Sequence, residues 1–281
     1  MSRRTRLLAL APLSLVIACG HAAMDTGGTI PIPAGHFTMG SSPYDRALAL
    51  EDGARYGADL RTGTRLLRAE QPERRVASAA FSIMVDAVTQ AEYAAYVYAT
   101  GAPEPWVDPV IWSRTPHRKG ANPERVQWER GRPRAARMDQ PAVLVSQPEA
   151  QAYCRWWGER RGGIGALPSE SEWERAARGD DGRIYPWGTR FEPTRANTRE
   201  SGRGDLQAVG SDAGATSPFG VQGMAGNVAE WTRSFERDLV VVKGAAYDDD
   251  LFAARAAARS LRTPVIRHVA IGFRCVLDPP R

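Results

Sequence analysis

The chain has 281 residues, of which 43% are hydrophobic and 25% are charged. This composition is that of a globular protein, and it excludes disorder as the main state. At roughly 150 residues per domain, the length allows one large or two small domains. The net charge is +5, but three of the 37 basic residues are arginines of an N-terminal leader. Without them, 34 basic residues remain against 32 acidic ones. We therefore expect no nucleic-acid partner.

The N-terminus is typical of a bacterial lipoprotein signal peptide over residues 1–18. Arg3, Arg4 and Arg6 precede an apolar run over residues 7–18, which is followed by Cys19. That run is shorter than the roughly 20 apolar residues that span a bilayer. We expect cleavage before Cys19, attachment of lipid to its thiol, and a protein anchored outside the cytoplasm, in the periplasm or at the surface. An ordinary secretory signal, with Cys19 incidental, is the alternative.

Residues 19–29 form a short Gly/Ala/Thr linker, after which the elements of a folded domain begin. Residues 30–40 alternate apolar residues with turn formers, which predicts a strand and its entry. Residues 43–75 are charged, glycine-punctuated and poor in periodicity, so we expect a surface excursion with at most a short helix. Residues 81–86 alternate again and predict a second strand.

Three capping boxes predict helix starts, because the first and fourth side chains satisfy each other's free backbone donors. They are Thr89–Glu92, Ser146–Glu149 and Ser169–Glu172. We expect the first helix to end before Gly101 and the third at Gly179. Between the first two helices, residues 102–140 fit neither the helix period nor the strand period of apolar residues. Their three tryptophans suggest a loop that packs onto the rest of the domain.

After residue 180 the chain is rich in glycine and proline, with short strands predicted at 239–242 and 270–275. A few helices among many loops and short strands predict a single, loop-rich α+β domain. Its expected bounds are residues 30–278.

Two cysteines remain once Cys19 carries lipid, and they are Cys154 and Cys275. An even pair in an oxidising compartment indicates one disulfide.

Several ordered motifs carry a resemblance to a known family. They are IPAGHFTMG at 32–40, VTQAEY at 88–93, QPAV at 140–143, LPSESEWE at 167–174, FGVQGMAGNVAEWT at 219–232 and IGFRC at 271–275. Together they resemble the formylglycine-generating enzyme or sulfatase-modifying-factor domain, an elaborated C-type-lectin-like fold. The resemblance covers roughly residues 30–277. It also implies the same disulfide, between Cys154 and Cys275.

The resemblance implies that the catalytic copper site is absent. Family members that make formylglycine hold Cu(I) on two cysteines just before an Ala-Ala-Arg-Ser segment, which is matched here at 257–260. The cysteine positions then correspond to Leu251 and Ala256. Cu(I) prefers sulfur ligands, and neither side chain has a metal-binding atom. We therefore expect no conversion of a sulfatase-type cysteine by the copper mechanism.

The family also binds structural calcium in loops, through oxygen ligands that suit a hard cation. The resemblance implies one site at Asn197 and the Thr198 carbonyl, with either Glu200 or Asp205 as its acidic ligand.

A second calcium site would use the Gly226 and Val228 carbonyls with Glu230. The usual Asn or Asp of this site aligns with Gly223, which removes one ligand. The alternative is that Glu230 is a buried carboxylate bonded to N–H groups of the loop.

Two classes of function remain open. The first is a binding or accessory module that recognises a peptide, a protein or a glycan through a loop-covered groove. The second is an oxidoreductase with a different active centre, for example in siderophore or peptide maturation. Convergent polar residues with perturbed pKa values in the groove would favour the second class. The candidate groove residues, chosen for their nearness in sequence to the vacated copper positions, are Tyr247, Asp248, Arg255, Arg259 and His268.

Overall fold

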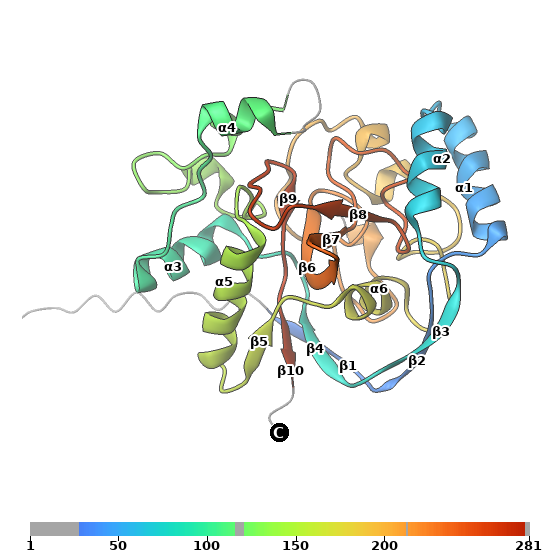
Figure 1. The fold of residues 1–281 in the computed structure, drawn as a ribbon, viewed down its shortest axis with the longest axis horizontal. Coiled ribbons are helices and arrows are strands. Elements are labelled where there is room, and N and C mark those ends of the chain that lie inside the picture. Colours follow the sequence, from blue (N-terminus) through green and yellow to red (C-terminus); the bar gives the residue numbers. More distant parts are fainter. Residues whose placement is uncertain (1–27, 116–120, 212, 279–281) are drawn as a thin grey trace, which may run out of the picture.

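The computed structural model describes residues 28–115, 121–211 and 213–278, which form one α+β domain (Figure 1). The predicted lipidation residue, Cys19, lies outside these residues. The first strand begins at Thr29, one residue before the predicted domain boundary. Among the described residues, no helix is both long and apolar enough to cross a bilayer.

Three small sheets form the centre of the domain. The first is antiparallel, with the strand order β1-β4-β10-β5. Strands from both ends of the domain, β1 and β10, therefore lie in one sheet, on either side of β4. Its strands are β1 (Thr29–Ile32), β4 (Phe81–Met84), β5 (Ile164–Ala166) and β10 (Val276–Asp278). The second is a two-stranded ribbon of β2 (Gly35–Met39) and β3 (Arg74–Ser78).

The third sheet has the order β8-β7-β6-β9, in which only the β6–β9 pair is parallel. Its strands are β6 (Ala229–Glu236), β7 (Leu239–Lys243), β8 (Arg259–Arg262) and β9 (Ile271–Gly272). The strand β8 is therefore an edge strand, paired with β7 on one side.

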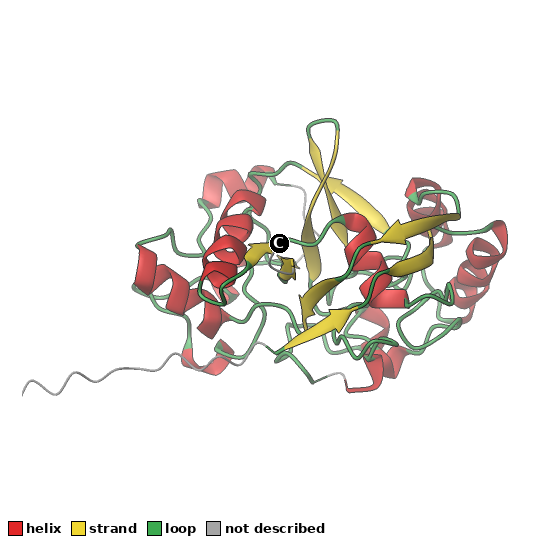
Figure 2. Ribbon diagram, turned by 90° about the horizontal axis from the view of Figure 1, so that it is seen from below, coloured by secondary structure: helices red, strands yellow, loops and turns green. Residues whose placement is uncertain are grey.

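Helices flank the strands at two ends of the molecule (Figure 2). Helices α3 and α5 lie at one end and α1 and α2 at the other, with α6 between them (Figure 1). The six α-helices of the described residues are α1 (Pro43–Arg55), α2 (Leu60–Ala69), α3 (Gln90–Thr100), α4 (Pro109–Arg114), α5 (Gln147–Glu159) and α6 (Glu170–Arg178).

The three predicted capping boxes are confirmed at the starts of α3, α5 and α6. Helix α3 ends at Gly101, which adopts the left-handed conformation that glycine tolerates best. The disulfide is also present: Cys154 on α5 joins Cys275 beside β10, and both are fully buried.

The expectation for residues 43–75 was wrong, because this segment contains both α1 and α2. The glycines within these helices had suggested a loop, but they allow the helix backbone to lie close to another residue, Phe252. A Cβ at Gly53 or Gly63 would lie 2.4 Å from the Phe252 ring, closer than side-chain contacts allow. The two helices therefore need glycine where they press against this ring, despite its poor helix propensity.

The expectation of no regular structure in residues 102–140 was also incomplete. The segment forms α4 and two short 3₁₀ turns, at Pro123–Arg125 and Ala135–Arg137. It packs down as expected at Trp112 and Trp128, which are buried, whereas Trp106 keeps 45% of its surface exposed.

Candidate functional site

A cleft lies between helix α2 and the edge strand β8, near in sequence to the vacated copper positions. Its volume is about 360 Å³, and segments 244–249 and 268–271 complete its walls. Three of the predicted groove residues line it: Asp248, Arg259 and His268. The size is that of a small-ligand or short-peptide site.

Two of the predicted groove residues do not line this cleft. Arg255 is 1% exposed and is bonded to the buried Glu70 carboxylate, beneath the surface. Tyr247 is half-buried and packs against a separate apolar cluster. Burial and the Asp248 charge raise the pKa of Tyr247 to about 12. Nearness in sequence did not predict which side chains reach the cleft, because the chain turns repeatedly between residues 247 and 258 and directs neighbouring side chains to different places.

Hydrocarbon fills the positions that correspond to the copper cysteines. Leu251 and Ala256 are both fully buried, and they belong to two different apolar clusters. Leu251 packs with Phe252 and Tyr185, whereas Ala256 packs in the cluster of Trp173. Within the described part of the chain, no three His, Cys, Asp or Glu side chains gather as a metal site. The arrangement offers Cu(I) no ligands.

The predicted cleft residues are all engaged by protein groups. Arg259 binds Glu170 through Nε at 2.8 Å and Glu236 through Nη1 at 2.7 Å. The Nδ1 atom of His268 accepts the Ala270 N–H at 3.1 Å.

Among the cleft residues that sequence reasoning missed are two charged ones, Arg65 on α2 and Arg262 on β8. Neither has an ion-pair partner within the described residues. The Arg262 guanidinium donates only to the Leu261 carbonyl, at 3.0 Å, and burial lowers its pKa. A signal was present in the sequence of α2, LRTGTRLLRA, which has three arginines and no acid.

The second predicted calcium set does not fit a cation as it is arranged. Glu230 is 1% exposed, and Arg274 binds both of its carboxylate oxygens, at 2.7 and 2.8 Å. The indole N–H of Trp173 donates to the same carboxylate at 2.8 Å. Glu230 is thus a buried carboxylate, as the alternative held, but a guanidinium and an indole bind it rather than N–H groups of the loop.

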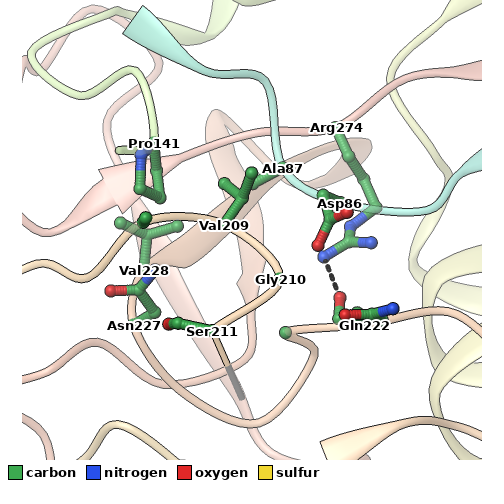
Figure 3. Close-up of a pocket in the computed structure, with 12 residues that line it drawn as sticks. Asp86, Ala87, Pro141, Val209, Gly210, Ser211, Gln222, Asn227, Val228 and Arg274 are labelled. Carbon is green, nitrogen blue, oxygen red and sulfur yellow. Dashed lines mark hydrogen bonds between the residues drawn. The ribbon is translucent and has the colours of Figure 1, made fainter. Parts of the chain in front are cut away.

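The Arg274 side chain also lies beside Gly223, the position of the missing ligand. Arg274 donates to the Gln222 carbonyl at 2.8 Å, as Figure 3 shows, and Gly223 itself has a positive φ of 67°. The adjoining cavity of about 20 Å³ has room for roughly one water. Burial raises the pKa of Asp86 in its wall, although the Arg274 charge opposes that shift.

The first predicted calcium set is also occupied by internal bonds. Glu200 accepts the Thr198 hydroxyl at 2.7 Å and the Leu251 N–H at 3.2 Å. Asp205 is bound by Arg125 and Arg137; despite burial, these bonds and charges lower its pKa.

One observation favours a bound water or cation at this set. The buried Asn197 Oδ1 has no hydrogen-bond partner within the described residues. One oxygen does not make a calcium site, which takes six to eight.

The comparisons with known proteins agree with the fold. Residues 18–279 match the sequence pattern of the family described as "Sulfatase-modifying factor enzyme 1-like domain". An inactive Cα-formylglycine-generating enzyme 2 from Bos taurus is 37% identical over 158 residues, which is 50% of each chain. The match thus spans about half the length of that relative.

Two further matches extend over most of the chain. A formylglycine-generating enzyme from Streptomyces coelicolor is 30% identical over 90% of each chain. The solved structure of PvdO from Pseudomonas aeruginosa is 25% identical and superimposes with a TM-score of 0.68, covering 89% of this chain and 94% of PvdO. With the family description spanning nearly the whole described domain, the chain belongs to the sulfatase-modifying factor enzyme 1-like family.

Proposed function

We propose that this chain is a lipid-anchored, extracytoplasmic recognition module that uses the fold of its family without the copper chemistry. The observation that carries this proposal is the hydrocarbon at Leu251 and Ala256, both fully buried. A thiolate pair is what Cu(I) requires, and the remaining cysteines, Cys154 and Cys275, are consumed by the disulfide. The similarity to relatives named as inactive supports the same conclusion.

The cleft between α2 and β8 is the site that we assign to recognition of a peptide, a protein or a glycan. It combines an apolar floor, including Ala229 and Val242, with polar groups at its walls. This combination is typical of ligand sites, in which a few polar groups fix the orientation of the ligand.

The absence of copper chemistry is tested with a Cys-x-Pro-x-Arg peptide, Cu(I) and O₂. We expect the mass of the peptide to remain unchanged after incubation with the full chain. The double variant Leu251→Cys with Ala256→Cys is the matched control, and its binding of copper would support the assignment of the two positions. Catalytic conversion of the peptide by the wild-type chain would overturn the proposal.

The anchor is tested separately, at Cys19. The basic residues, the apolar run and the cysteine that follows it motivate this part of the proposal. Cys19→Ser is expected to abolish lipid labelling and to move the protein from the membrane to the soluble fraction. Unchanged partitioning of this variant would refute the anchor but leave the recognition role standing.

An oxidoreductase with a different centre is the second candidate. His268, Asp248 and Asp249 line the cleft, but they do not gather as a metal site within the described residues, so this candidate is supported by the family membership of the chain alone. Metal analysis of the purified chain separates the two candidates. Stoichiometric iron or copper would favour the oxidoreductase, whereas a chain free of both would favour the recognition module.

A further inference from the structure

Two arginines of the cleft, Arg65 of α2 and Arg262 of β8, form no ion pair within the described residues, although the Asp249 charge acts on Arg262 from a distance. Helix α2 contains Arg61, Arg65 and Arg68 and no acidic residue. The pairs 61–65 and 65–68 are spaced so that like charges repel each other on the helix surface. Of these arginines, Arg65 lines the cleft, and the unpaired Arg262 of β8 lines it too. Two exposed arginines that line one cleft without an ion pair suit an anionic ligand.

Arg262 is the better placed of the two to bind an anion. Arg262 is exposed at the cleft; the protein atoms around its guanidinium partly desolvate it and lower its pKa, against the opposing effect of the Asp249 charge. A guanidinium presents several N–H donors in a planar fork that matches a carboxylate. Within the described residues, Arg262 uses one of these donors, in a hydrogen bond to the Leu261 carbonyl. In such a setting a charge-assisted hydrogen bond is stronger than in open water.

The strand that carries Arg262 also offers a main-chain edge. β8 pairs with β7 on one side only, as Val240–Lys243 face Arg259–Arg262 in antiparallel register. The α2 residues Thr62, Arg65 and Leu66 line the cleft on the other side of it. An edge strand beside a cleft is the arrangement to which an extended peptide adds as a further strand.

The carboxylates of the cleft argue against a polyanion such as a sulfated glycan. Asp248 and Asp249 both line the cleft; the Asp249 carboxylate accepts the Ala246 N–H at 2.9 Å, and its charge acts on Arg262. A chain with anionic groups along its whole length would meet these carboxylates. A peptide avoids that repulsion because it carries a carboxylate on one side and amide donors along its main chain.

We propose that the cleft binds an extended acidic peptide, with a carboxylate side chain held between Arg65 and Arg262 and its main chain added to the edge of β8. This inference rests on the proposed recognition function and names its ligand class. It also distinguishes this chain from an enzyme that acts on a Cys-x-Pro-x-Arg peptide, which contains a basic side chain.

The test measures fluorescence anisotropy with the full chain and three fluorescein-labelled peptides of equal length. Their central residues are Glu-Ser-Glu, Gln-Ser-Gln or Lys-Ser-Lys. We expect the acidic peptide to bind most tightly, and added salt to weaken that binding. Arg65→Gln and Arg262→Gln should each weaken it roughly tenfold, as expected for loss of one charge-assisted contact.

The matched control is Arg155→Gln, because Arg155 is exposed on α5 and does not line the cleft. It should leave the affinity unchanged. Equal binding of the three peptides, or acidic binding that is indifferent to both cleft variants, would overturn the inference while recognition itself survives. If a heparin fragment binds through Arg262 and none of the peptides does, the ligand class is wrong. If neither peptides nor heparin bind, the proposed recognition function fails as well.

Discussion

The arginines of the interior differ from two of the three arginines that line the cleft; the third, Arg259, is paired with Glu170 and Glu236. In the interior, Arg274 has its guanidinium bound by Glu230 and by main-chain carbonyls, and it is fully buried. Arg178 likewise binds the buried Glu174, which also accepts from Lys243 at 2.9 Å. In the cleft, Arg65 and Arg262 have no ion-pair partner within the described residues.

This difference separates the residues that stabilise the fold from those that are available to a ligand. Glu174, Glu230 and Arg274 all lie in the motifs that carry the family resemblance, at 167–174, 219–232 and 271–275. Their polar atoms are consumed by bonds within the domain, so the motifs specify the architecture. Arg65 and Arg262 of the cleft lie outside those motifs, and we expect them to determine which ligand the cleft binds.

The largest expected effect on the interior comes from removing the disulfide. The double variant Cys154→Ala with Cys275→Ala opens a link across 121 positions, so we expect a loss of about 4–5 kcal/mol in the free energy of unfolding. Urea denaturation measures it, with thiol counting on the wild type as the control for oxidation. A loss below about 1 kcal/mol would mean that the cross-link does not restrict the unfolded chain as this model of disulfides assumes.

A buried charge network should be the next most sensitive feature. Glu174→Gln leaves Lys243 and Arg178 buried without their shared carboxylate, at an expected cost of about 3–5 kcal/mol. The matched control is Glu51→Gln, which breaks an exposed pair with Arg190 and should cost less than about 1 kcal/mol. Equal effects of the two variants in urea denaturation would remove the distinction between interior and surface charge.

Alkaline pH should reveal the half-buried Tyr247 beside the cleft. Its pKa is raised from 10.0 to about 12, so the unfolded chain loses this proton first. The contribution to stability is present below pH 10 and is lost as the pH rises through about 12. The Tm of Tyr247→Phe should therefore fall less than that of the wild type across this window. Parallel curves for the two proteins would show that Tyr247 is not shifted.

Calcium should have the smallest effect, because the candidate carboxylates are already bonded. Glu230 is held by Arg274, and Asp205 by Arg125 and Arg137. A ligand stabilises a fold only where it binds the folded state, so we expect no shift in Tm on adding calcium or a chelator. A rise in Tm that Asn197→Ala abolishes would show instead that these side chains rearrange around the ion.

Much of the fold was predictable because its signals are local. A capping box needs only four residues, and the boxes at Thr89, Ser146 and Ser169 all begin helices. The helices α1 and α2 were not predictable in the same way. Their glycines are explained by Phe252, which is about 190 residues away in sequence.

The site was predictable only in part, for a related reason. Asp248, Arg259 and His268 do line one cleft, but Arg255 is turned inward to Glu70. Arg65 was missed because its wall of the cleft comes from a helix distant in sequence, which folds back on β8. Spacing along one segment does not show which remote element will cover it.

The most direct measurement is the free energy of unfolding of Arg274→Gln and Arg262→Gln, compared in the same urea titration. If interior arginines serve the fold and cleft arginines serve a ligand, Arg274→Gln should lose about 3–5 kcal/mol, since it strands the buried Glu230. Arg262→Gln should stay within about 0.5 kcal/mol of the wild type or gain stability, as surface changes outside a network do. A comparable loss in both variants would contradict the account, because Arg262 would then be part of the structural framework.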